Sequence, residues 1–257
     1  MEYLIICLTA FLASGLTLFS GFGLGTILLP AFALFFPVDI SVALTAIVHF
    51  LNNIFKLTLL GKNADKTIVL KFGIPAILFA LLGAYLLTFL ADLPPLIQYS
   101  ISGKTFVVTP IKLTIAFLLI FFSLFDLIPK LSNLKFDKKY LPLGGVLSGF
   151  FGGLSGNQGA LRSAFLIRAG LSKEAFIATG VVIACLIDFS RLIVYSKQII
   201  ESADHINYYL MISATFAAFI GAFTGTRLIK KITLKTLHYI VAVMLFIFAI
   251  LLGTGII

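Results

Sequence analysis

The sequence predicts an all-α polytopic membrane protein built from two inverted repeats, and three observations support this fold class. First, 60% of the 257 residues are hydrophobic and 11% are charged, with a mean hydropathy of +1.14, far from the composition of globular domains. Second, apolar runs of about 20 residues, long enough to span a bilayer as helices, recur along the chain. Third, glycine-rich stretches interrupt two of these runs, at 21–26 and 152–159.

The apolar segments are expected to be helical, and most of them are long enough to cross a membrane. Short polar stretches separate them, and no stretch is long or polar enough to form a separate soluble domain. The expected segments are 3–20, 24–37, 40–60, 67–90, 108–129, 141–168, 172–196, 207–229 and 236–257.

The first interruption reads Gly21-Phe-Gly-Leu-Gly-Thr26 and lies inside the apolar run from Tyr3 to Phe36. Three glycines at alternate positions have no use inside a continuous helix, where each costs roughly 1 kcal/mol relative to alanine. Backbone groups that such a break frees at membrane depth are tolerated only beside a cavity or against other protein. The break is therefore either the meeting point of two short helices, where a ligand can bind, or a tight helical hairpin with close glycine packing.

The second interruption indicates that the chain is duplicated. Each interruption is followed by an apolar half-helix, a short turn and a full span. The two repeats would cover 1–129 and 141–257, joined by the polar linker 130–140. Motifs at matching positions are Ala43-Leu-Thr45 with Ile177-Ala-Thr179, and Leu82-Gly-Ala-Tyr85 with Ile220-Gly-Ala-Phe223.

The net charge of +9 comes mainly from short loops, so it indicates membrane orientation and not a nucleic-acid partner. If each broken segment crossed the membrane once, the basic residues would divide almost evenly between the two sides. If each is a hairpin that returns to its own side, the basic regions 56–71, 130–140, 168–173 and 227–235 share one side. The positive-inside rule favours the hairpin model, which places the linker in the cytoplasm and the two halves in opposite orientation.

The polar side chains of the second break are those of Ser155, Asn157 and Gln158. A helix is expected to begin near Gly159 and to point its free N–H groups at this break. Another helix is expected to begin near Thr26 and to do the same from the first half. Two facing helix starts suit a small oxyanion; the alternative is that the polar groups only cap one another.

Three charged side chains are expected in the membrane interior. Arg162 follows Gly159 by one helical turn and should face a cavity or a partner, because an arginine at the bilayer centre costs at least about 2.5–3.5 kcal/mol. Its planar guanidinium matches the oxygens of a small oxyanion, and the alternative is that it snorkels to the interface. Asp188 and Arg191 are spaced i, i+3 and either form an intrahelical pair or let Asp188 carry a coupling proton or bind Na⁺.

A polar stripe marks the span that follows the first break. Thr45, His49, Asn53 and Lys56 have helical spacing, so they should face the protein interior, with Asn52 beside them. His49 could relay a proton, although a packing role is the alternative. We expect Lys56 to snorkel to the interface.

Cysteine and motif content indicate which chemistry is absent. Cys7 and Cys185 lie in apolar segments and have no CxxC spacing, so neither a disulfide framework nor a metal site is indicated. No HExxH, GxSxG, paired Cys/His cluster or nucleotide motif is present in the sequence. We therefore expect neither an enzyme nor a bound cofactor.

Short glycine-rich motifs recur in both halves. They are Gly21-Phe-Gly-Leu-Gly-Thr-Ile-Leu-Leu-Pro30, Val42-Ala-Leu-Thr45, Leu82-Gly-Ala-Tyr-Leu86, Gly149-Phe-Phe-Gly-Gly-Leu-Ser-Gly156, Phe176-Ile-Ala-Thr179 and Phe219-Ile-Gly-Ala-Phe223. Together they resemble the sulfite exporter TauE/SafE family of membrane transporters, over nearly the whole chain. The second break departs from the family pattern: Asn157, Gln158 and Arg162 make it polar, and Ala164 stands in place of a proline.

The resemblance implies a secondary transporter in the cell (inner) membrane that moves small sulfur-containing anions, such as sulfite, sulfoacetate or other organosulfonates, by alternating access. The alternative is a channel-like conduit, or a carrier for another small anion or metabolite. The expected partners are the anion, the lipid bilayer, and H⁺ or Na⁺ as coupling ion, while transport direction and oligomeric state stay open. The candidate substrate-binding residues are Gly21, Gly23, Gly25, Thr26, Asn52, Asn53, Ser155, Asn157, Gln158, Gly159 and Arg162, and the candidate coupling residues are His49, Asp188 and Arg191.

Overall fold

The chain is predominantly helical, which confirms the prediction of an all-α polytopic membrane protein. The computed structural model describes residues 1–17, 23–132, 134–203, 206–228 and 234–257. The centre of the first predicted break, including Gly21, lies outside the described residues.

The helices follow the predicted segments closely in both halves. The first half contains α1 (Glu2–Thr17), α2 (Leu24–Ala33), α3 (Val38–Leu60), the 3₁₀ turn η1 (Gly61–Asn63), α4 (Lys66–Ala91), β1 (Ile97–Ile101), β2 (Lys104–Val108), α5 (Pro110–Leu127) and α6 (Pro129–Ser132). The linker contains the 3₁₀ turn η2 (Lys138–Tyr140), and the second half contains α7 (Leu141–Ser155), α8 (Gly159–Leu166), α9 (Lys173–Glu201), α10 (Tyr208–Leu228) and α11 (Leu234–Gly253).

Four helices in the described part of the chain are long and apolar enough to cross a membrane. They are Val38–Thr58 in α3, Lys66–Ala91 in α4, Lys173–Glu201 in α9 and Tyr208–Gly225 in α10. Shorter apolar helices come from α1, α2, α5 and α11. Both breaks are followed by half-helices, since α2 and α8 are each too short to cross a membrane.

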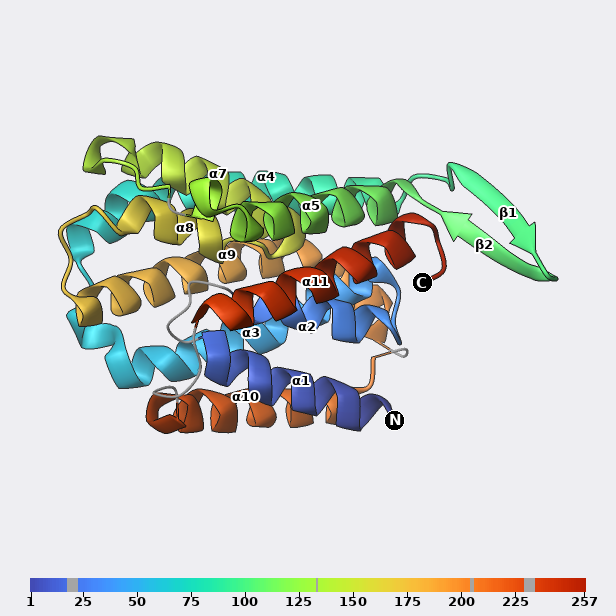
Figure 1. The fold of residues 1–257 in the computed structure, drawn as a ribbon, viewed down its shortest axis with the longest axis horizontal. Coiled ribbons are helices and arrows are strands. Elements are labelled where there is room, and N and C mark those ends of the chain that lie inside the picture. Colours follow the sequence, from blue (N-terminus) through green and yellow to red (C-terminus); the bar gives the residue numbers. More distant parts are fainter. Residues whose placement is uncertain (18–22, 133, 204–205, 229–233) are drawn as a thin grey trace.

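Both broken segments fold back on themselves (Figure 1). The chain runs through α1 and returns through α2 to the end of the molecule where it began, and α7 with α8 does the same from the opposite end. Helices α3, α4 and α5 run opposite in direction to α9, α10 and α11, respectively. This arrangement supports the hairpin model and the opposite orientation of the halves, while the repeat relation itself stays a prediction.

Hydrogen bonds between distant segments define one end of the molecule. The Asp65 backbone N–H donates to Thr179 Oγ1 at 2.9 Å, and the Phe136 N–H donates to the Ala164 carbonyl at 3.1 Å. We call this end, with its many lysines and arginines, the basic end. Its described segments are 61–71, 130–140 (residue 133 excepted) and 166–173.

The opposite end holds the N-terminus and the strands. Here Tyr3 donates a hydrogen bond to Asn207 Oδ1 at 3.1 Å, and the Gln198 side chain donates to Asp39. The segregation of basic segments to the other end is the pattern from which the hairpin model was predicted. We therefore expect the basic end to face the cytoplasm.

Glycine lets two pairs of helices approach closely. Helix α7 packs along α4, where a methyl group on Gly149 would lie 2.3 Å from the Ala76 carbonyl oxygen. Helix α1 packs along α10, where a methyl group on Gly221 would lie 2.1 Å from the Phe11 carbonyl oxygen. Because α1 and α7 hold equivalent places in the two expected repeats, as do α10 and α4, this reciprocal packing supports a two-fold relation.

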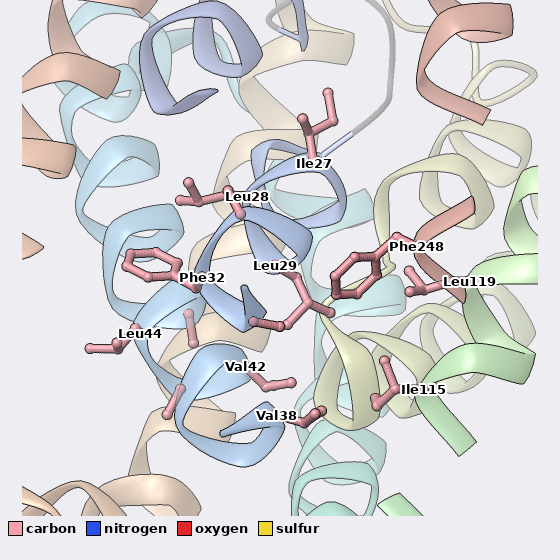
Figure 2. Close-up of a cluster of buried hydrophobic side chains, with 14 of the residues drawn as sticks. Ile27, Leu28, Leu29, Phe32, Val38, Val42, Leu44, Ile115, Leu119 and Phe248 are labelled. Carbon is pink, nitrogen blue, oxygen red and sulfur yellow. The ribbon is translucent and has the colours of Figure 1, made fainter. Parts of the chain in front are cut away.

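Helix α2 is enclosed by protein along its whole length. All of its residues are buried. Figure 2 shows Leu29 among Val42 of α3, Ile115 and Leu119 of α5, and Phe248 of α11. Burial on all sides lets this half-helix sit at membrane depth without contact with lipid.

A β-hairpin was not predicted and follows α4. Strands β1 and β2 pair antiparallel and project beyond the helices (Figure 1). Their turn uses Ser102 and Gly103, which have φ angles of 52° and 77°, as the tightest hairpin turns require. The hairpin is tied to the C-terminal end of the chain, because Tyr99 donates a hydrogen bond to the Thr254 carbonyl at 2.5 Å.

Candidate functional site

Asp188 of α9 is the hub of a buried hydrogen-bond network that joins the two halves. Its Oδ1 accepts from Gln158 Nε2 at 3.2 Å and from Arg191 Nε and Nη2 at 3.1 and 2.8 Å. Its Oδ2 lies 2.6 Å from His49 Nδ1 and accepts from Asn53 Nδ2 at 3.2 Å. All five side chains are buried. We call His49, Asn53, Gln158, Asp188 and Arg191 the polar centre.

The contact with Asp188 orients the His49 ring. Since Nδ1 faces the carboxylate, we assign the ring proton to Nδ1, which leaves Nε2 as an acceptor in the neutral ring. Asn53 Nδ2 lies 3.1 Å from Nδ1 and 3.5 Å from Nε2, and we assign its donated bond to Asp188 because Nδ1 already donates. Nε2 faces the first break, since a methyl group on Gly23 would lie 3.7 Å from it.

Arg191 forms the intrahelical pair with Asp188 that its i, i+3 spacing predicts. Both side chains are fully buried. Arg191 Nη1 lies beside Gly156, where a methyl group would be 2.9 Å away, and has no hydrogen-bond partner among the described residues. Gly156 ends α7 with a φ of +80°, so the break needs glycine both for its backbone and for its approach to Arg191.

The two breaks meet at Gly25 and Gly156. A methyl group on Gly25 would lie 3.6 Å from the Gly156 carbonyl oxygen and 3.6 Å from Thr45 Cγ2. Thr45 Oγ1 and both amide atoms of Asn157 are buried, and they lack hydrogen-bond partners within the described residues. Thr45 and Arg191 Nη1 lie at the contact between the breaks, and Asn157 directly follows Gly156 in the chain. We call this cluster the junction.

Two helices begin at the junction without a side-chain cap. Gly23 is the N-cap of α2 and Gln158 is the N-cap of α8, and neither helix start receives a side-chain cap bond. The early residues Thr26 and Gly159 are buried. Uncapped helix starts carry free N–H groups and the positive end of the helix dipole, so both favour a negative charge.

Ser155 serves its own helix more than the junction. Its Oγ donates to the Phe151 carbonyl at 3.1 Å and accepts, at 3.5 Å, from the Asn157 N–H. The Asn157 side chain remains unpartnered among the described residues. The expectation that the polar groups of this break cap one another therefore fits Ser155 but not the side chain of Asn157.

Arg162 and Lys56 lie beside the polar centre on its basic side. Arg162 Nη1 donates to Gln158 Oε1 at 2.9 Å, so Arg162 has the partner that its membrane position requires. The prediction that Lys56 snorkels is wrong, because this side chain is 6% exposed. When the Asn52 amide is oriented to donate to the Ala218 carbonyl at 3.3 Å, its oxygen accepts from Lys56 Nζ at 3.1 Å.

Two further side chains belong to this region, and sequence reasoning gave neither of them a role. Tyr195 is fully buried one turn beyond Arg191 and donates a hydrogen bond to the Gly153 carbonyl of α7. Ser148 donates to the Gln158 carbonyl at 3.1 Å, which fixes the backbone of the second break. The helical spacing of Tyr195 with Asp188 and Arg191 was the signal that could have identified the first of them.

The comparisons with known proteins assign a family. No group of three or more His, Cys, Asp or Glu side chains in the described part of the chain could hold a metal ion. A search of curated proteins and a search of solved structures each gave no match. The family model described as "Sulfite exporter TauE/SafE" matches residues 6–252, nearly the whole chain. The chain therefore belongs to the sulfite exporter TauE/SafE family, whose members are membrane transporters and not enzymes.

Proposed function

We propose that this chain carries small sulfur-containing oxyanions, such as sulfite or organosulfonates, across the cell membrane, and that the anion binds at the junction. The observation that carries the proposal is a set of buried polar atoms there, on Thr45, Asn157 and Arg191, that have no hydrogen-bond partner among the described residues. A buried polar group without a partner costs about 1–3 kcal/mol. A ligand that accepts hydrogen bonds from Arg191 Nη1 and Asn157 Nδ2 removes most of that cost.

Charge favours an anion over a neutral or cationic ligand. Asp188 is already saturated by donors from four side chains, so Arg191 Nη1 directs its remaining N–H groups at the junction. The starts of α2 and α8 add two positive helix ends. Guanidinium and backbone N–H groups are the donors that proteins use for tetrahedral and pyramidal oxyanions.

The position of the junction between the two halves supports alternating access. One wall comes from α2 and α3 of the first half, and the other from α7, α8 and α9 of the second half. Relative movement of the halves would separate these walls toward one membrane side at a time, as in transporters with inverted repeats. The family, a group of transporters, supports this mechanism over an enzyme.

His49 is the proposed coupling group, with H⁺ as the coupling ion. Its Nδ1 is engaged by Asp188, and its Nε2 faces the start of α2 at the junction. A proton on Nε2 would add a donor and a positive charge next to the anion, so proton binding and anion binding would favour each other. Asp188 then acts as a positioning residue, because it holds both His49 and Arg191 in place.

Binding to purified protein tests the site. Sulfite and sulfoacetate should raise the melting temperature of the wild type, and the neutral compound dimethyl sulfone should not. Asn157→Ala should lower the apparent affinity obtained from this shift at least tenfold. The substitution removes the Asn157 Nδ2 donor and leaves the Asp188 contacts in place. Ser123→Ala is the matched control: this side chain is buried in α5, and its hydroxyl donates to the Leu119 carbonyl and to no other described residue. No shift in the wild type would overturn the proposal.

A further inference from the structure

Two basic side chains near the junction, buried Lys56 and partly buried Arg162, have no carboxylate partner among the described residues. Within the described residues, Asp188 pairs with His49 and Arg191, and no ion pair includes Lys56 or Arg162. An isolated charge in the membrane interior is costly unless it is paired or solvated. Neither cation forms an ion pair in the part of the chain that the structure describes, so the two ion pairs of Asp188 do not neutralise the charges of Lys56 and Arg162.

Lys56 and Arg162 lie at the same depth. Helices α3 and α9 run antiparallel (Figure 1), and His49 pairs with Asp188, so Lys56, two turns beyond His49, falls at the level of residue 181 of α9. Arg162 reaches the same level from α8, since a methyl group on Gly180 would lie 3.5 Å from Arg162 Nε. Both cations therefore belong to the same layer of the molecule, near residues 180 and 181 of α9.

Within the described ranges, each cation is held by one amide oxygen and has donors left over. Lys56 Nζ donates to the Asn52 oxygen, and Arg162 Nη1 donates to Gln158 Oε1. These bonds use one of the three N–H groups of Lys56 and one of the five of Arg162. Amide oxygens orient the two heads without neutralising them, so the positive charge stays available to a ligand.

We propose that Lys56 and Arg162 form a second anion-binding station on the side of Gln158 that faces the basic end, near residues 180 and 181 of α9, about 10 Å along this helix from Asp188. Its ligand is the same class of small oxyanion, held by the ammonium on one side and the guanidinium on the other. The station rests on the proposed function and deepens it. An anion leaving the junction toward the basic end passes this station. The basic residues within 61–71 and 166–173 lie beyond the station and continue the positive field.

Equilibrium dialysis with radiolabelled sulfite tests the station on the purified full chain. The wild type should bind two sulfite ions at saturation, and Lys56→Gln should bind one. Lys112→Gln, which removes a lysine bonded to the Val107 carbonyl at the opposite end, is the matched control and should still bind two. Asn157→Ala should bind one, because the junction and the station are separate.

The outcomes distinguish the two proposals. One sulfite in both the wild type and Lys56→Gln overturns the station and leaves the junction standing. No binding in the wild type overturns both. If Lys56→Gln does not fold, Arg162→Gln provides the same test, and two sulfite ions bound to it would overturn the station.

Discussion

His49 Nδ1 lies 2.6 Å from Asp188 Oδ2, so one buried hydrogen bond links α3 of the first half to α9 of the second. The same carboxylate accepts from Arg191, which reaches the second break, while His49 Nε2 faces the first. Both breaks are therefore positioned by one acidic group. Any movement of one half against the other must act on this contact.

Replacing Asp188 should destabilise the fold strongly. Asp188→Asn leaves Arg191 buried without a counter-charge, and loss of one partner of a buried pair costs about 3–5 kcal/mol. We expect a large fall in the melting temperature when thermal unfolding is followed by circular dichroism. Asp92→Asn, at an exposed helix end, should leave it nearly unchanged. A melting temperature equal to that of the wild type would show that the pair does not hold the centre together.

The close packing of α7 on α4 should not tolerate a larger side chain in place of glycine. Gly149→Val would drive its Cβ to 2.3 Å from the Ala76 carbonyl oxygen, so the helices must separate, at a cost of several kcal/mol. Gly253→Ala meets only the Ala116 Cβ at 3.4 Å and should cost much less. Thermal unfolding in detergent compares the two variants. Equal stability of both would contradict the packing account.

His49 should make transport depend on pH. With methanesulfonate, whose charge is constant over the tested range, the half-saturation concentration should rise as pH increases, because deprotonation removes a donor and a positive charge from the junction. In His49→Gln the amide keeps a polar group in place, and the half-saturation concentration should become nearly independent of pH. Uptake into proteoliposomes at several pH values measures this. An unchanged pH profile in the variant rules out His49 as the coupling group.

The basic end should face the cytoplasm. In a background with Cys7 and Cys185 replaced by alanine, a cysteine at Asn63 should react with an impermeant maleimide only from the cytoplasmic side. A cysteine at Ser100, in the projecting hairpin, should react only from the other side. The opposite labelling pattern would show that the basic end lies outside the cytoplasm, which would contradict the orientation predicted from the distribution of basic residues.

The sequence predicted the helices and both breaks well, because apolar length and clustered glycine are local signals. Gly25 and Gly156 were identified as members of two breaks, and their contact follows once the halves fold together. The β-hairpin was missed because each strand has only five residues and the hairpin lies between two long apolar helices. Its Ser102-Gly103 turn was the available signal.

Pairing across the chain could not be predicted from spacing. His49 and Asp188 are 139 positions apart, so no helical periodicity relates them. Lys56 was expected at the interface because lysine can extend along a helix, yet Asn52 and the neighbouring helices hold its head inside. Both cases depend on tertiary packing, which brings together side chains whose contact cannot be predicted from the spacing of residues along the sequence.

The central claim, an anion carrier whose site is the junction, is tested most directly by initial rates of radiolabelled sulfite uptake into proteoliposomes at increasing concentration. We predict saturable uptake by the wild type and by Ser123→Ala, and at least a tenfold loss of kcat/KM in Asn157→Ala. Uptake that stays linear in concentration, or is equal in Asn157→Ala and the wild type, would contradict the account.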